Sequence, residues 1–247
     1  MKSSEPFRRH HSEKIKTSTL IYDRYTGMYW LCIPRMTEER VINTYKLKCG
    51  IDPGIRTFLT TYSSEECREI GTDISFQKYY DKIDSLNHAY NIGKLSNKSR
   101  RRAVSKVYSK IKRKVKDMHF KVAKYLCESY NDIRIGHLKT QQLVNNETSK
   151  LSKANKRKLM SLSHFSFRKT LESQAEKYGV DSMVVSEYMT TQTCSRCGCS
   201  YKVGKSKVYR CPTVNSDGTR CGLVADRDMN AAKNIRYMLL PCTEGDP

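Results

Sequence analysis

The feature that most constrains this chain is a cluster of cysteines near its C-terminal end. Of ten cysteines, five lie between Cys194 and Cys221. Cys194 and Cys197 form a CxxC pair, and Cys211 and Cys221 add two thiols from a later segment. Two pairs of thiolates on facing turns supply the tetrahedral ligand set that structural Zn²⁺ prefers. The sequence therefore predicts a zinc site formed by Cys194, Cys197, Cys211 and Cys221.

Two alternatives to this zinc site stay open from the sequence. Cys199 could replace Cys197, although the two-residue spacing favours Cys197. A redox CxxC is the other alternative, but it does not explain the second pair of cysteines. No histidine follows His164, which excludes a Cys₂His₂ finger. Because a site closed by four thiolates has no open position, the expected zinc is structural rather than catalytic.

The charge balance narrows the class of partner. The 247 residues include 46 Lys and Arg against 25 Asp and Glu, a formal net charge of +21. Such a chain repels itself unless an anion neutralises it, and nucleic acid is the commonest such partner, with an anionic membrane surface as the alternative. The charged residues 1–16 do not resemble a secretory signal, and no apolar run approaches the roughly 18–20 residues of a membrane span. We therefore expect no membrane partner and a reducing intracellular compartment, the cytoplasm or the nucleus.

Strand-like and helix-like segments alternate along the chain. Strands are expected at residues 20–22, 29–33, 45–51, 57–62, 133–135 and 183–185, the first two joined as a hairpin by the turn 25–27. Helices are expected over about 76–130, 163–178 and 228–240, and residues 140–152 are expected to form a polar loop. This order predicts an α/β fold in which a mixed sheet is flanked by helices.

The long helical segment carries much of the positive charge. Residues 94–124 contain 13 Lys and Arg against one acid, Asp117. A basic helix face is expected to contact nucleic-acid phosphates with little sequence preference, and a merely solvated face is the alternative. The candidate contacts are Arg100, Arg101, Arg102, Lys106, Lys110, Lys112, Arg113 and Lys114. Tyr108 and Tyr125 lie in the apolar stripe and are expected in the core rather than as stacking platforms for bases.

Carboxylates far apart in the sequence could converge on one point. Asp52 ends an apolar strand, Asp228 begins the last helix, and Glu187 follows the strand at 183–186, directly before the cysteine cluster. Hard divalent ions such as Mg²⁺ bind converging oxygen ligands, and two such ions clamp the attacking and leaving oxygens of a phosphodiester. The alternative is that Asp52 is a turn residue before Pro53 and that Asp228 caps its helix.

Three segments, taken in chain order, resemble the TnpB (OrfB) family of transposon-encoded proteins, which is kin to Fanzor proteins and type V CRISPR effectors. They are Gly-Ile-Asp-Pro-Gly at 50–54, Thr-Thr-Gln-Thr leading into the CxxC at 190–198, and Asp-Arg-Asp-Met-Asn-Ala-Ala-Lys-Asn-Ile at 226–235. The match runs from about Leu20 to Ile235 and includes the end of the basic helix at 119–126. The resemblance implies an RNase H-like RuvC nuclease fold with an inserted zinc ribbon. It also implies Mg²⁺-dependent cleavage of DNA, guided by a transposon-derived RNA and associated with transposition.

The resemblance also assigns roles to the carboxylates. Asp52 matches the first RuvC aspartate and Asp228 the last. The middle glutamate of the family usually ends the strand at 133–135, where this chain has Gly136. A branch with viral and Fanzor-like members carries the acid just before the CxxC, and Glu187 fits that pattern, with an exposed strand-end acid as the alternative. Asp52, Glu187 and Asp228 would then hold two catalytic Mg²⁺ ions.

The resemblance finally implies a division of the chain. The expected parts are a flexible basic arm at 1–16, a hairpin remnant of a wedge-like barrel at 17–48, a RuvC-like core with the basic helical insert at 49–187, the zinc ribbon at 188–225, the last RuvC helix at 226–241 and a tail at 242–247. About 50 residues precede Asp52, fewer than the recognition domain and barrel of full-length members need. Three functions stay open: a TnpB-type nuclease, a nucleic-acid-binding remnant that cannot cut, and a zinc-ribbon transcription-type factor in which Asp52 has no role.

Overall fold

The computed structural model describes residues 17–23, 27–34, 47–145, 149–204, 206–214 and 217–237. Its strands are β1 (Thr19–Asp23), β2 (Met28–Cys32), β3 (Leu47–Pro53), β4 (Leu59–Tyr62), β5 (Cys67–Ile70), β6 (Tyr130–Gly136), β7 (Asp181–Val185), β8 (Val208–Arg210) and β9 (Val224–Asp226). Its helices are α1 (Gln77–Asn91), α2 (Asn97–Ser129), α3 (Thr140–Val144), α4 (Lys153–Leu162), α5 (His164–Tyr178) and α6 (Arg227–Tyr237). The expected basic arm at 1–16 and the tail at 242–247 lie outside these ranges.

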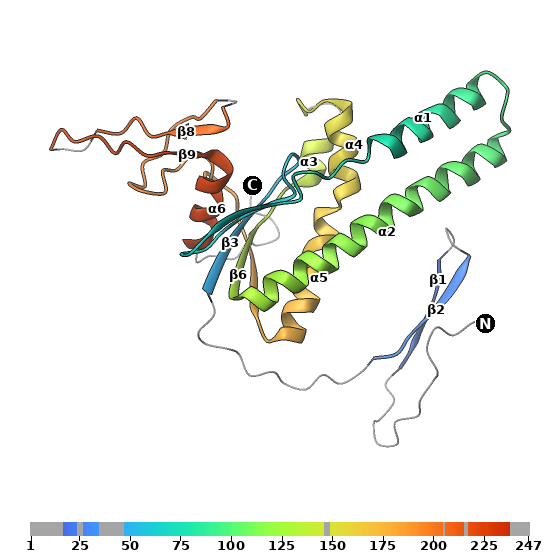
Figure 1. Ribbon diagram of the computed structural model, residues 1–247, viewed down its shortest axis with the longest axis horizontal. Helices are drawn as coiled ribbons and strands as arrows, with labels where there is room; N and C mark the ends of the chain where they lie inside the picture. The colour runs from blue at the N-terminus through green and yellow to red at the C-terminus, as the bar shows by residue number, and fades with distance from the viewer. Residues whose placement is uncertain are drawn as a thin grey trace.

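A five-stranded sheet in the order β5-β4-β3-β6-β7 forms the centre of the fold. The pairs β3–β4 and β4–β5 are antiparallel, whereas β3–β6 and β6–β7 are parallel. Helices flank this sheet (Figure 1), which confirms the expected α/β fold with a mixed sheet between helices. Strand β5 was not expected, because its four residues, Cys-Arg-Glu-Ile, show no apolar run in the sequence.

The two faces of the sheet pack against different helices, as the alternation along β3 shows. Cys49 and Ile51 are fully buried in the main core, which also contains residues of β6, α2 and α5. Gly50 faces the other side, where the backbone of α6 lies so close that a Cβ on Gly50 would come 2.2 Å from the carbonyl oxygen of Ala232. Since side chains two residues apart in a strand share a face, Asp52 lies on the α6 side with Gly50.

A buried aromatic cluster fixes the loop that follows β3. The ring of Phe58 stacks on that of His164, with centroids 5.0 Å apart, and meets Phe167 edge-on at 5.1 Å. Nε2 of His164 lies 2.9 Å from the carbonyl oxygen of Gly54. Burial lowers the pKa of His164 to about 4, so the ring is neutral near pH 7 and Nε2 can donate to that carbonyl. This bond ties the chain just after Asp52 to α5.

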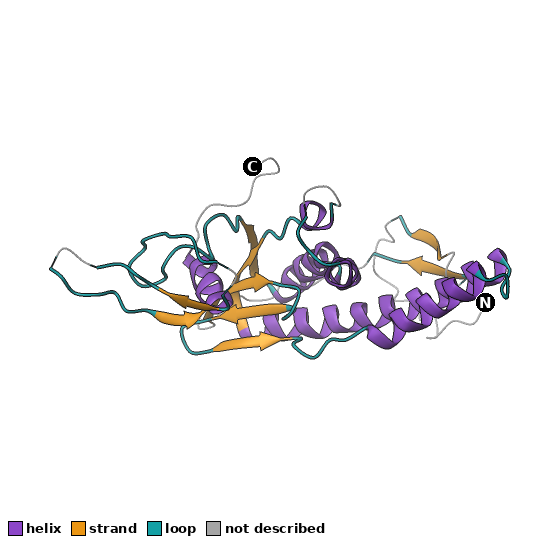
Figure 2. Ribbon diagram, turned by 90° about the horizontal axis from the view of Figure 1, so that it is seen from above, coloured by secondary structure: helices purple, strands orange, loops and turns teal. Residues whose placement is uncertain are grey.

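The predicted helix over 76–130 is two helices rather than one. Helix α1 ends before Gly93, whose φ of +73° is a left-handed conformation that glycine adopts without strain. Helix α2 then begins after Ser96, whose Oγ accepts a hydrogen bond from the backbone N–H of Ser99 at 3.2 Å. The two helices pack against each other and extend beyond the sheet as an arm (Figure 2). Gly93 and Ser96 are the signals in the sequence that mark this break.

The predicted loop at 140–152 was wrong over residues 140–144, which form α3, and the following helix α4 was not expected. Helix α4 begins after Ser152, whose Oγ accepts a hydrogen bond from the N–H of Asn155. Leu159 and Leu162 are its buried residues. The large apolar residues of α4 all lie in its last four positions, which is too short a stripe to identify an amphipathic helix.

The expected N-terminal hairpin is present as the antiparallel pair β1–β2. Its side chains are exposed almost throughout, including Leu20, Tyr29 and Trp30. The expected turn at 25–27 is described only at Gly27, which has a positive φ. No helix in the described part of the chain is both long enough and apolar enough to cross a lipid bilayer.

We expect Gly50→Ala to destabilise the fold, because the added Cβ would meet the backbone of α6 at Ala232 and Arg236. Forcing an extra methyl into such a contact costs about 1–3 kcal/mol of unfolding free energy. Gly204→Ala is the matched control, because nothing lies within 4 Å of a Cβ at that position. Urea denaturation of both variants measures this free energy. Equal stability of Gly50→Ala and the control would contradict the close packing of α6 on β3.

Candidate functional site

The end of β3 and the start of α6 bring Asp52 and Asp228 together. Asp52 is the next-to-last residue of β3, and Asp228 is the second residue of α6. Helix α6 packs directly on β3, as Figure 1 shows with α6 in red against that strand. The negative charge of Asp228 is among the causes that raise the pKa of Asp52. The two carboxylates are therefore electrostatic neighbours, although 175 residues separate them in the sequence.

Asp226, rather than Asp228, caps helix α6. Oδ1 of Asp226 accepts hydrogen bonds from the backbone N–H groups of Asp228 at 2.8 Å and Met229 at 3.3 Å. These are the bonds that an N-capping carboxylate makes. The alternative in which Asp228 caps its helix is therefore wrong, and its carboxylate instead forms an ion pair with Arg227 at 3.3 Å.

Glu187 occupies the space above Gly136. Gly136 ends β6 beside the end of β7, where it pairs with Val185. A Cβ on Gly136 would lie 2.5 Å from Oε1 of Glu187 and 2.7 Å from its Cγ. Oε1 of Glu187 is buried and has no hydrogen-bond partner among the described residues. Glu187 is therefore a partly buried side chain folded over the end of β6, and not an exposed strand-end acid.

The register of the sheet explains why this position is close to Asp52. Strand β3 pairs in parallel with β6, with Ile51 opposite Ile135. Asp52 and Gly136 are the next residues in each strand, so they lie side by side at the carboxyl ends of neighbouring strands. Glu187, which lies over Gly136, is thus at the same end of the strands as Asp52.

The electrostatics of the three carboxylates reflect this crowding. Burial raises the pKa of Asp52 well above its usual value, the negative charges of Glu187 and Asp228 raise it further, and Arg227 opposes them. Burial also raises the pKa of Glu187 to about 7, against a lowering effect of Arg168. Neighbouring buried carboxylates resist sharing negative charge unless a cation or a proton compensates it.

These residues fit a divalent cation in donor chemistry. All three supply oxygen ligands of the kind that Mg²⁺ prefers, and the unpartnered Oε1 of Glu187 is a buried acceptor without a donor in the described chain. Glu187 and Asp228 both act electrostatically on Asp52, but the three carboxylates do not form as tight a group as the cysteines. Among the described residues, the four thiols are the one set of three or more Cys, His, Asp and Glu that converges closely enough to hold an ion.

A hollow of about 270 Å³ lies beside Glu187. Its lining comes from the segments that follow β6 and β7 and from α3, and includes His137, Lys139, Gln142 and Tyr188. Tyr188 is 77% exposed. An extended polar ligand could thus approach Glu187 from solvent.

The four predicted cysteines form a tight cluster. The sulfurs of Cys194, Cys197, Cys211 and Cys221 all lie within 4.8 Å of one another. Cys194 and Cys221 are 3.7 Å apart, and Cys197 and Cys211 are 3.6 Å apart. A tetrahedral zinc with bonds of about 2.3 Å needs sulfurs about 3.8 Å apart. The cluster therefore could hold a metal such as Zn²⁺.

Backbone amides point at the sulfurs, as expected for thiolates that bind a metal. The N–H of Arg196 donates to Sγ of Cys194 at 3.4 Å. An amide hydrogen bond from Cys199 is the largest cause that lowers the pKa of Cys197 to about 6. Cys199 contributes this backbone group while its own side chain is exposed and lies outside the cluster. The geometry thus favours Cys197 over Cys199 as the fourth thiol.

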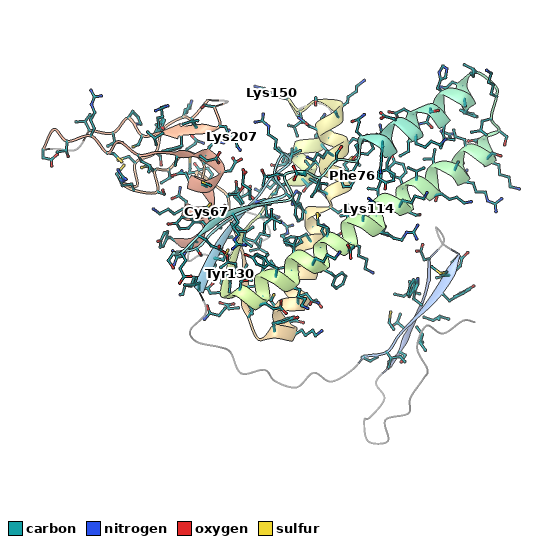
Figure 3. The ribbon with its side chains drawn as sticks, in the orientation of Figure 1. Cys67, Phe76, Lys114, Tyr130, Lys150 and Lys207 are labelled. Carbon is teal, nitrogen blue, oxygen red and sulfur yellow. The ribbon has the colours of Figure 1, made fainter. Side chains whose placement is uncertain are left out.

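Side chains outside the predicted set also shape the site. Arg227 opposes the raised pKa of Asp52, and Arg168 opposes that of Glu187. Arg227 stands between Asp226 and Asp228 in the last segment that resembles the family, so the sequence contained a signal for it. Arg168 lies on α5, and only the packing of α5 in the fold brings it near Glu187. Lys207, labelled in Figure 3, forms ion pairs with Glu69 of β5 at 3.2 Å and with Asp226 at 3.4 Å.

The basic candidates are distributed along α2, where Figure 3 labels Lys114. Seven are exposed: Arg101, Arg102, Lys106, Lys110, Lys112, Arg113 and Lys114. Arg100 differs, because it is partly buried, hydrogen-bonds the side chain of Asn87 at 3.2 Å and lies over the ring of Tyr90 at 4.6 Å. Arg100 therefore holds α2 against α1.

The two stripe tyrosines of α2 have different environments. Tyr125 packs against the core, and its hydroxyl donates to Glu66 at 3.3 Å. Tyr108 is 44% exposed, so its expected place in the core was wrong.

Family models match both halves of the chain. The model described as "Probable transposase" (OrfB_IS605) matches residues 35–147. The model "Cas12f1-like, TNB domain" matches residues 164–235. "TnpB-like protein L79" of Acanthamoeba polyphaga mimivirus is 40% identical over 228 residues. The chain belongs to the TnpB-like family. The alignment with L79 covers 89% of this chain and 42% of the relative, so the chain spans about two fifths of that protein's length.

Solved structures show the same fold at low sequence identity. The chain is similar to the Cas12f1 protein of a "Cas12f1-sgRNA-target DNA complex", with a TM-score of 0.54 and 16% identity over 85% of this chain and 53% of that one. It is equally similar to the protein of a "CRISPR-Cas12f Ternary Complex", with a TM-score of 0.54 and 16% identity over 88% of this chain and 44% of that one. The TnpB-like chain therefore shares its mixed sheet and flanking helices with the Cas12f proteins of these complexes.

We expect the purified TnpB-like chain to contain about one zinc per molecule, and Cys211→Ser to lose most of it. Cys199→Ser is the matched control, because this neighbouring thiol lies outside the cluster. Metal released by acid and measured by mass spectrometry distinguishes the two variants. Retention of zinc by Cys211→Ser, or its loss from Cys199→Ser, would contradict the ligand set.

Proposed function

We propose that this chain is the nuclease part of a TnpB-like protein, cutting DNA with divalent metal held by Asp52, Glu187 and Asp228 and guided by a transposon-derived RNA. The observation that supports it most is the position of Glu187 over Gly136, beside Asp52. That position supplies a third carboxylate where β6 itself has none. The family membership and the similarity to Cas12f nucleases agree with this reading.

The proposed chemistry follows from the residues present. Bound Mg²⁺ ions would supply a water activated for attack on a phosphodiester and would stabilise the charge that develops. Asp52, Glu187 and Asp228 would hold these ions, relieving the crowding that raises the pKa of Asp52. Arg227 and Arg168 would add fixed positive charge beside the anionic backbone of the substrate.

The arm of α1 and α2 is the proposed nucleic-acid surface. A shallow groove of about 420 Å³ on this arm is lined by Tyr79, Lys110, Arg113, Lys114 and Asp117. The seven exposed candidates on α2 would contact phosphates, giving affinity that falls steeply with salt. DNA and the guide RNA are both candidates for this surface, because phosphate contacts carry little sequence information.

The proposed division of the TnpB-like chain follows its elements. Residues 49–187 would be the nuclease core with the arm inserted in it, and residues 188–225 a zinc ribbon. Residues 226–241 would be the helix that completes the core. The hairpin within 17–48 would belong to a barrel that precedes the core in longer relatives.

The test is cleavage of single-stranded DNA by the purified chain in Mg²⁺ or Mn²⁺, with and without RNA co-purified from the host. We expect Asp52→Asn and Glu187→Gln to lower the cleavage rate at least about 100-fold, since even outer-shell partners of a metal are worth about 10- to 100-fold. Glu176→Gln, an exposed acid on α5, is the matched control and should keep the wild-type rate.

The outcomes separate the candidate functions. Cleavage by the wild-type chain that Glu187→Gln abolishes supports the nuclease and its third carboxylate. Cleavage that Glu187→Gln leaves intact would remove Glu187 from the site. Salt-sensitive DNA or RNA binding without metal-dependent cleavage would instead indicate the nucleic-acid-binding remnant.

A further inference from the structure

Two asparagines of α6 hold the segment that joins Glu187 to the cysteine cluster. The side chain of Asn230 is 2% exposed and uses both ends of its amide. Its Oδ1 accepts from the N–H of Ser195 at 3.0 Å, and its Nδ2 donates to the carbonyl of Thr193 at 2.8 Å. One turn later, Nδ2 of Asn234 donates to the carbonyls of Thr190 and Thr193, both at 2.8 Å.

The same segment is bonded directly to Glu187. Thr190 is 1% exposed. Its backbone N–H donates to the carbonyl of Glu187 at 3.2 Å, and its Oγ1 donates to the same carbonyl at 3.0 Å. These two bonds close the turn that begins at Glu187. Because Thr190 is itself held by Asn234, the turn is anchored to α6.

The anchoring helix also bears Asp228, and the anchored segment continues into Cys194. Asn230 and Asn234 are one helical turn apart, so both amides face the same side of α6. Their four hydrogen bonds bind three backbone carbonyls or amides of residues 190–195. A chain of hydrogen bonds therefore connects α6, which bears Asp228, to Glu187 through the Asn234 amide and Thr190. This connection does not involve the sheet.

From these hydrogen bonds we infer that Thr190 and Asn234 are positioning residues that fix the Glu187 carboxylate relative to Asp228. The inference rests on the proposed function and adds the residues that set the geometry of its site. Neither residue needs to touch the substrate. A variant that lacks either side chain would keep all three carboxylates, but Glu187 would no longer be held at a fixed distance from Asp228. Metal binding and turnover would then weaken together.

The test uses an isosteric pair at Thr190. Thr190→Val removes the hydroxyl and keeps the shape, whereas Thr190→Ser keeps the hydroxyl. Asn234→Asp keeps the size of the side chain but replaces the donating amide. Thr170→Val is the matched control, because the hydroxyl of Thr170 makes a comparable bond to the carbonyl of Ser166, at 2.9 Å on α5.

Two readouts are needed, and the first does not depend on activity. Hydrogen exchange of residues 186–195, followed by mass spectrometry, should become about fivefold faster in Thr190→Val and Asn234→Asp. The second readout is cleavage in Mn²⁺, where kcat should fall about tenfold and half-saturation by Mn²⁺ should rise, with KM for DNA unchanged. Thr190→Ser and Thr170→Val should match the wild type in both.

The readouts also separate this inference from the proposed function. Unchanged hydrogen exchange in both Thr190→Val and Asn234→Asp would overturn the inference, whatever the cleavage result. Faster exchange with wild-type kcat and Mn²⁺ dependence would overturn it as well. Faster exchange in a chain whose wild type neither binds Mn²⁺ nor cleaves DNA would support the anchoring of Glu187 and contradict the nuclease alone.

Discussion

The contact of α6 with β3 at Gly50 is the constraint on which the rest of this structure depends. Because Gly50 has no side chain, the backbone of the helix lies directly on the strand at Ala232 and Arg236. That contact places Asp228 over the end of the strand, near Asp52. It also fixes the side of α6 that binds the segment leading from Glu187 to the cysteines. One close approach thus organises carboxylates from three distant parts of the chain.

Two kinds of metal chemistry meet at this helix. The cysteine cluster has four sulfurs at tetrahedral spacing and amides that support them, so it suits a closed structural ion. Asp52 and Glu187 are oxygen donors with raised pKa values, and a hollow open to solvent lies beside Glu187, which suits an exchangeable hard cation. In the proposed nuclease the first kind of site shapes the second, because Cys194 and Glu187 bracket the segment that α6 holds.

The sequence predicted features whose signals are local. Cysteine spacing predicted the four clustered thiols, and strand and helix patterns predicted the mixed sheet between helices. Contacts made by the fold were not accessible in this way. The position of Glu187 over Gly136 depends on the neighbouring ends of β6 and β7. In the sequence, Arg100 does not differ from its basic neighbours, because its packing on Tyr90 of α1 is a contact made by the fold. Helix α4 buries only two leucines, too few to produce a pattern.

In the proposed site, Glu187 supplies from the end of β7 the carboxylate that Gly136 lacks. The most direct test moves the glutamate from position 187 to position 136. It compares metal-dependent DNA cleavage by Glu187→Gly with cleavage by the double variant Glu187→Gly, Gly136→Glu. Removing Glu187 empties the space that a side chain at position 136 would fill. We expect the single variant to be inactive and the double variant to regain cleavage. A folded double variant as inactive as the single one, or a fully active Glu187→Gly, would contradict it.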